Sequence, residues 1–207
     1  MATKEYSCVK KTKRAFEKAL VELSKEYPFN KITVKMLCER AELSRNAFYF
    51  HYEDINDLLR SIENSLAAEA ENLIGSLRDI GFPKNVYASV EGLINLFDEN
   101  RETCRMLFDK AVSESFTQRM NNLFCDFNYQ YFAEYHGESK KVRFEFFYAF
   151  ISNGFYGLLS HWLENPDLMT KSEVTAMAYI LVKRLLILGD PDITDAISKA
   201  AISRKEK

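Results

Sequence analysis

Apolar residues recur every three or four positions along almost the whole chain, and no segment alternates convincingly between apolar and polar residues. This spacing is typical of amphipathic helices, and all four prolines fall between the periodic segments or in the first turn of one. The pattern predicts an all-α chain of about nine to ten helices. They are expected over residues 10–25, 34–41, 44–52, 54–79, 83–99, 102–111, 114–135, 139–163, 170–189 and 190–203.

The two short helices expected over 34–41 and 44–52 are too small to enclose a core of their own. They follow a longer amphipathic helix on which both can pack, which predicts a three-helix unit with the second short helix turned outward. Thr33 and Ser44 stand where these two helices need N-caps. The sequence therefore predicts a helix-turn-helix domain over residues 1–53, followed by a helical domain over residues 54–207.

The outward side of the second short helix carries hydrogen-bond donors. Arg45 and Asn46 stand near its start, where a helix-turn-helix meets base edges, and these residue types can pair with guanine and adenine through two hydrogen bonds. The neighbouring polar residues are better suited to phosphates. The alternative interpretation is a solvated helix face with no partner. The residues expected at a DNA interface are Thr33, Lys35, Ser44, Arg45, Asn46, Ala47, Tyr49 and His51.

The charges are unevenly distributed along the chain. The formal net charge is −2, but residues 1–60 carry 12 Lys and Arg against 9 Asp and Glu, whereas the remainder carries 16 against 21. A basic module suits a polyanion such as double-stranded DNA, although modest asymmetry also arises by chance. The charge distribution therefore agrees with a DNA interface without establishing one.

The segments FNKITV (residues 29–34) and AELSRNAFYFHY (residues 41–52), together with Asp57-Leu58-Leu59, resemble the DNA-binding domain of the TetR/AcrR family. The likeness extends over roughly residues 10–60. It implies a homodimer that binds double-stranded operator DNA, with a divergent C-terminal domain that binds a small-molecule effector and lets the DNA go when filled. The expectation is a repressor on a pseudo-palindromic operator.

The sequence departs from the family pattern in three places. Glu42 stands in the turn where the family usually has glycine, and because a left-handed backbone strains a glutamate, a differently shaped turn is expected. Asn46 replaces a frequent glycine and makes the tip of the second short helix bulkier. Ile55 and Asn56 occupy the region where the family usually carries a phosphate-binding lysine.

The chain is rich in aromatic residues, with 16 Phe and 11 Tyr, most of them after residue 80. Many recur at helical spacing and are expected to fill an ordinary core. A helical domain of this composition can also enclose an apolar cavity with a few polar anchors. The residues predicted for such an effector pocket are Phe97, Phe108, Phe124, Tyr148 and Asn153.

The segments 144–163 and 174–188 are the most apolar of the expected helices. A helix that is apolar on nearly all sides is a buried helix, and in the TetR family the last two long helices pair across a twofold axis. Gly154 and Gly157 permit close helix approach, either between subunits or within one. The predicted dimer interface comprises Phe150, Gly154, Gly157, Leu158, Trp162, Leu181 and Leu185.

Other chemistries find little support in the sequence. The four cysteines cluster neither with one another nor with histidine, so no metal site is expected and the thiols should be reduced. No phosphate-binding glycine loop, carboxylate–histidine pair or nucleophile motif occurs, so neither catalytic residues nor a cofactor are expected. No signal peptide or membrane span is evident, which suggests a cytoplasmic protein. An activator of the same fold, an all-helical enzyme and a structural helical protein remain as alternatives.

Overall fold

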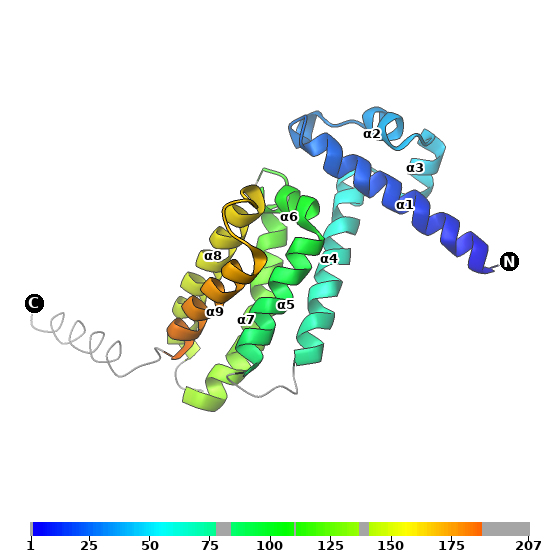
Figure 1. The fold of residues 1–207 in the computed structure, drawn as a ribbon. Helices are drawn as coiled ribbons and strands as arrows, with labels where there is room; N and C mark the ends of the chain where they lie inside the picture. The colour runs from blue at the N-terminus through cyan, green and yellow to red at the C-terminus, as the bar shows by residue number, and fades with distance from the viewer. Residues whose placement is uncertain (1, 78–83, 110, 137–140, 188–207) are drawn as a thin grey trace, which may run out of the picture. The chain divides into compact units, whose positions relative to one another are not determined.

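The computed structural model describes residues 2–77, 84–109, 111–136 and 141–187. Within these ranges every regular element is helical, which confirms the all-α prediction. The elements are α1 (Ala2–Ser24), a 3₁₀ turn (Phe29–Lys31), α2 (Val34–Ala41), α3 (Arg45–His51), α4 (Ile55–Leu77), α5 (Lys84–Glu99), α6 (Arg101–Phe108), α7 (Glu114–His136), α8 (Lys141–Glu164) and α9 (Lys171–Ile187) (Figure 1).

Most of these helices begin and end within a few residues of the predicted positions. The start of α9 shows why, because the Thr170 hydroxyl accepts a hydrogen bond from the Glu173 N–H at 3.3 Å and the Glu173 carboxylate accepts one from the Thr170 N–H at 2.8 Å. This reciprocal capping box follows directly from the sequence. The first helix is the exception, since α1 begins at Ala2 and not near residue 10. The helix predicted over 190–203 lies outside the described residues.

The chain forms two compact units. The first comprises Met1–Ala70 with Asn100–Arg119, and the second comprises Glu71–Glu99 with Met120–Lys207. Both α4 and α7 therefore contribute residues to each unit. The functional boundary predicted after residue 53 falls inside the first unit and stays a prediction.

The core of the first unit is aromatic and aliphatic. In Figure 1, α1 lies along α2 and α3, and it also contacts α6. Phe16 of α1 and Phe48 of α3 are both fully buried, and their rings meet edge to face with centroids 5.3 Å apart. Leu20, Leu37 and Leu58 are likewise fully buried. Because the inner side of α3 is fixed by Phe48, the opposite side of this helix must face outward.

Polar contacts join the remaining elements of the first unit. Lys25, just after α1, forms an ion pair of 2.7 Å with Glu102 of α6. The hydroxyl of Ser113, which precedes α7, donates a hydrogen bond to the carboxylate of Glu63 in α4. The ion pair connects the end of α1 to a helix that lies far from it in sequence, and the hydrogen bond joins α4 to the segment before α7.

In the second unit, α9 packs against both α5 and α8 (Figure 1). Tyr87 of α5 meets Tyr179 of α9 edge to face, with ring centroids 5.1 Å apart. Lys171 at the start of α9 forms an ion pair of 3.5 Å with Asp98 near the end of α5. This arrangement leaves an apolar cavity between α5 and α8, which is described below.

Candidate nucleic-acid interface and internal cavity

The short helices α2 and α3 are held at their starts by the two predicted N-caps. The Thr33 hydroxyl accepts a hydrogen bond from the Met36 N–H at 3.3 Å, and the Ser44 hydroxyl accepts one from the Ala47 N–H at 3.1 Å. Each cap satisfies a backbone donor that the first helical turn leaves without a partner. Both hydroxyls are therefore occupied by the helix starts, and contacts to DNA would have to be made in addition.

The turn between α2 and α3 keeps the left-handed backbone despite lacking a glycine. Glu42 has φ 55° and ψ 37°, and its N–H bonds to carbonyls of the last turn of α2. Leu43 continues the C-cap, with its N–H donating to the Cys38 carbonyl at 3.0 Å. The expectation of a differently shaped turn is therefore wrong. The hydrogen bonds that close α2 hold Glu42 in the strained conformation.

This strain predicts that Glu42→Gly stabilises the protein. A left-handed residue other than glycine costs about 1–2 kcal/mol, and the greater freedom of glycine in the unfolded chain offsets about 0.5–1 kcal/mol of the gain. A net increase of about 0.5–1 kcal/mol in the free energy of unfolding is expected, measured by urea denaturation. Glu39→Gly, at an exposed right-handed position of α2, should instead lose about 1 kcal/mol. A destabilised Glu42→Gly variant would contradict the left-handed turn.

The outward face of α3 carries four exposed side chains from two consecutive turns. Arg45 and Asn46 are exposed in the first turn, and Tyr49 and Phe50 follow at 59% and 79% exposure. Since residues four apart lie on the same helix face, Tyr49 lies next to Arg45 and Phe50 next to Asn46. We call these four residues the reading face. Ala47 lies at its edge and is half-buried.

Sequence reasoning missed Phe50, because only hydrogen-bond donors were considered for the outward side. The available signal was its spacing, four residues after Asn46. Among the ring contacts described, Phe50 makes only one, which is an edge-to-face contact with the neighbouring His51 ring. The two ring centroids are 4.9 Å apart. An exposed phenylalanine on a polar helix face is well suited to an apolar partner such as the methyl group of thymine.

His51 ends α3 and lies close to α1. Burial lowers the pKa of the imidazole below 6.5, and the positive charge of Lys13 lowers it further. The neutral form of the ring therefore predominates at pH 7, and it can still donate one N–H to a phosphate oxygen. Lys13 also lies over the ring of Tyr52, with its ammonium 5.8 Å from the centroid. Burial raises the pKa of the nearby Glu17 carboxyl, against the opposing effect of Lys13 and Arg14.

The basic side chains around α2 differ in whether they are available to contact a phosphate. The guanidinium of Arg40 is held against α1 by the carboxylates of Glu26 at 2.9 Å and Glu22 at 3.6 Å. Lys35 makes only a loose pair of 3.8 Å with Glu39 one turn along, with both side chains largely exposed. Such surface pairs contribute little energy. Arg40 therefore has a structural role, whereas Lys35 can exchange its carboxylate for a phosphate.

The start of α4 provides no cation at the position where the family usually carries one. Asp54 caps the helix by accepting a hydrogen bond from the Asp57 N–H at 2.7 Å. Ile55 is half-buried and Asn56 is exposed. A phosphate contact here would have to come from an amide side chain or from the backbone.

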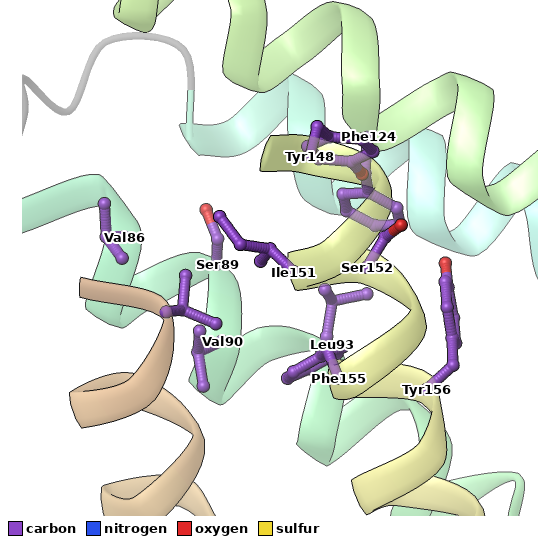
Figure 2. Close-up of a pocket in the computed structure, with 11 residues that line it drawn as sticks. Val86, Ser89, Val90, Leu93, Phe124, Tyr148, Ile151, Ser152, Phe155 and Tyr156 are labelled. Carbon is purple, nitrogen blue, oxygen red and sulfur yellow. The ribbon is translucent and has the colours of Figure 1, made fainter. Parts of the chain in front are cut away.

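The second unit contains a small, partly open cavity, shown in Figure 2. Its volume is about 60 Å³. Seven apolar and four hydroxyl-bearing residues line it: Val86, Ser89, Val90, Leu93, Phe124, Tyr148, Ile151, Ser152, Phe155, Tyr156 and Val182. Most of these residues belong to α5 and α8, because the two helices face each other across the opening.

Two of the five residues predicted for an effector pocket line this cavity, namely Phe124 and Tyr148. Phe97 is fully buried and is not among the lining residues. Phe108 belongs to the first unit. Asn153 is exposed, and its side-chain amide donates to the Ala149 carbonyl at 2.7 Å. The structure thus groups Phe124 and Tyr148 with serines that sequence reasoning did not single out.

An exposed apolar surface runs along α8 and α9. Phe150 of α8 is 69% exposed and Leu181 of α9 is 50% exposed, with Phe146, Met177 and Ile180 also exposed. Gly154 and Gly157 are open, with no atom within 4 Å of where a Cβ would stand. We call these seven residues the α8/α9 face. Exposed apolar patches of this kind mark association surfaces.

The other predicted interface residues lie differently. Trp162 is only 5% exposed, and its indole N–H donates to the Met169 carbonyl at 2.9 Å, so it packs within its own chain. Leu158 is half-buried. Leu185 lies in α9, with its side chain outside the described part of the structure.

The residues that the structure describes support neither a membrane span nor a metal site. No helix there combines the length and apolar character that a bilayer span requires. The same residues bring together no group of three or more His, Cys, Asp or Glu able to hold a metal ion.

The fold combines a helix-turn-helix in the first unit with a helical second unit. Residues 84–184 match the TetR_C_8 family, described as "Transcriptional regulator C-terminal region". Over these residues the chain is similar to the C-terminal region of TetR-family transcriptional regulators.

Solved structures have the same fold. The TetR transcriptional regulator from Streptococcus agalactiae is 22% identical with a TM-score of 0.56, over 88% of this chain and 99% of that one. The fatty acid degradation regulator FadR from Bacillus halodurans is 10% identical with a TM-score of 0.65, over 84% and 94%. A putative TetR-family regulator from Syntrophomonas wolfei is 16% identical with a TM-score of 0.64, over 86% and 96%. No curated protein matches this sequence.

Proposed function

We propose that this protein is a cytoplasmic, non-enzymatic TetR-family repressor that binds a pseudo-palindromic operator as a homodimer and releases it when a small molecule binds. Residues 1–53 would form the DNA-binding domain, and residues 54–207 would bind the effector and form the dimer. The observation that carries the proposal is the reading face, because α3 exposes hydrogen-bonding and apolar side chains together on one capped helix.

Each residue of the reading face has a role in this proposal. Arg45 contacts guanine and Asn46 contacts adenine through paired hydrogen bonds, in the turn that enters the major groove first. Phe50 packs against a thymine methyl group beside the base pair read by Asn46. Tyr49 contacts the backbone of the DNA.

The residues flanking the reading face position it on the duplex. Lys35, Thr33 and His51 contact phosphates, and Ser44 and Ala47 set the start of α3. The exposed Lys35 and the neutral imidazole of His51 support these contacts, since both can donate hydrogen bonds to phosphate oxygens.

Dimer formation is assigned to the α8/α9 face. A single recognition helix makes too few base contacts for useful specificity, and two copies related by a twofold axis double them. The exposed apolar side chains and the two open glycines support close packing of α8 and α9 from two subunits. The effector is assigned to the cavity between α5 and α8 in the same unit.

A DNA selection from random sequences tests the proposal. The bound pool should contain two inverted half-sites whose centres are about 34–36 Å apart, which is one turn of B-DNA. A reporter placed behind the selected operator should rise in expression when the regulator gene is deleted. A fall in expression would instead identify an activator, and the failure to select any DNA would refute the proposed function.

A further inference from the structure

We propose that the cavity of the second unit takes an uncharged ligand with an apolar body and one hydrogen-bond acceptor, such as a neutral aryl ketone, ester or ether. The inference rests on the proposed function in one respect, namely that this cavity is the effector site. It adds the chemical class of that effector, which follows from the atoms of the cavity wall.

The wall of the cavity carries no formal charge among its described residues. Seven of the eleven lining side chains are hydrocarbon, and the other four end in hydroxyl groups. A carboxylate, phosphate or ammonium group placed here would lose its hydration without gaining a counterion. Anionic and cationic ligands are therefore disfavoured, and the hydrocarbon surface favours an apolar body.

Ser89 supplies the second part of the argument. Its side chain on α5 is buried and lines the cavity (Figure 2), and its Oγ has no hydrogen-bond partner among the residues that the structure describes. A buried hydroxyl without a partner is unfavourable, and a ligand acceptor within the cavity would remove that penalty. The hydroxyl of Ser89 is thus the polar anchor of the site.

The other three hydroxyl groups of the wall bear on whether the ligand donates or accepts a hydrogen bond in the cavity. Burial raises the pKa of Tyr148 and of Tyr156 well above the usual value for a phenol, so both stay protonated and neutral. Ser152 donates its hydroxyl to the Ala149 carbonyl at 3.3 Å. The described wall contains no carboxylate or amide oxygen to accept the Ser89 proton, so an acceptor on the ligand would satisfy this donor.

Four compounds of similar size separate these possibilities. Acetophenone is neutral and carries an acceptor, ethylbenzene lacks the acceptor, benzoate is an anion, and 1-phenylethylamine is a cation at neutral pH. Titration calorimetry with the full-length protein should show acetophenone binding most tightly and ethylbenzene about fivefold more weakly, as expected for one hydrogen bond. Benzoate and the amine should give no measurable heat of binding at the same concentrations.

A serine variant assigns the acceptor contact to one residue. Ser89→Ala should reduce the affinity for acetophenone to that for ethylbenzene and leave ethylbenzene unchanged. Ser160→Ala is the matched control, because Ser160 lies on α8 and does not line the cavity. Equal reduction with both variants would indicate a general effect on the fold and overturn the role of Ser89.

Three results would overturn the ligand class: benzoate bound as tightly as acetophenone, an unchanged acetophenone affinity in Ser89→Ala, or binding of none of the four compounds. Operator binding is measured on the same preparations. A protein that binds DNA but shows the wrong order of ligands refutes only this inference. A protein with the expected order of ligands that selects no DNA refutes only the proposed function.

Discussion

Replacing Arg45 with alanine is expected to weaken operator binding by roughly 100-fold and to abolish the preference for guanine at one position of each half-site. A bidentate arginine–guanine pair discriminates against the wrong base by about 1–3 kcal/mol, and a dimer makes this contact twice. The effect is large because Arg45 is exposed at the capped start of α3, where nothing else in the reading face provides a cation.

Fluorescence anisotropy titrations on the selected operator measure this effect. Lys171→Ala removes the same charge from the second unit, breaks the pair with Asp98, and should leave operator affinity unchanged. Lys35→Ala should weaken binding to all sequences alike and lower its salt dependence, as expected for a phosphate contact. An Arg45→Ala protein with unchanged affinity and sequence preference would rule out α3 as the reading element.

The same titrations distinguish Phe50 from Arg45. Phe50→Ala should remove a preference for thymine and leave the guanine preference intact. Replacing that thymine with uracil deletes only the methyl group, so it should weaken the wild-type protein and have no effect on Phe50→Ala. Equal sensitivity of both proteins to uracil would mean that Phe50 does not contact the methyl group.

Elements with strong local signals could be predicted from the sequence. Thr33 and Ser44 cap their helices as expected, because an N-cap depends on a side chain and a backbone N–H only three residues apart. The outward position of Arg45 and Asn46 follows from the burial of Phe48, which the helical period makes evident. These features require no knowledge of distant parts of the chain.

The features that sequence reasoning missed depend on packing between distant segments. The apolar residues of α8 surround the helix almost completely, so the period alone does not separate the side that faces α5 from the side that faces outward. Trp162 was accordingly predicted at the dimer interface, although it is buried within the chain. Phe108 was predicted in the pocket although it lies in the first unit. The left-handed Glu42 was missed because local propensity argues against it, while the hydrogen bonds that close α2 override that preference.

Leu181→Glu is expected to convert the dimer to a monomer and thereby reduce operator affinity by at least 100-fold. Leu181 is half-exposed in the isolated chain, so a glutamate there remains solvated in the monomer and leaves the fold intact. In a symmetric dimer the same change introduces two buried carboxylates that lie against apolar side chains without a counterion. The substitution therefore destabilises the dimer and not the folded monomer. Each monomer has only one reading face.

Sedimentation equilibrium and operator titration on the same protein test this expectation. Leu168→Glu is the matched control, because Leu168 is 71% exposed between α8 and α9 and does not belong to the α8/α9 face. That variant should remain dimeric with full operator affinity, and both variants should keep the wild-type circular dichroism spectrum. If Leu181→Glu stayed dimeric, subunits would have to associate through another surface. If it became monomeric yet bound the full operator with wild-type affinity, the two half-sites would not be read cooperatively, and the role of the dimer in specificity would be wrong.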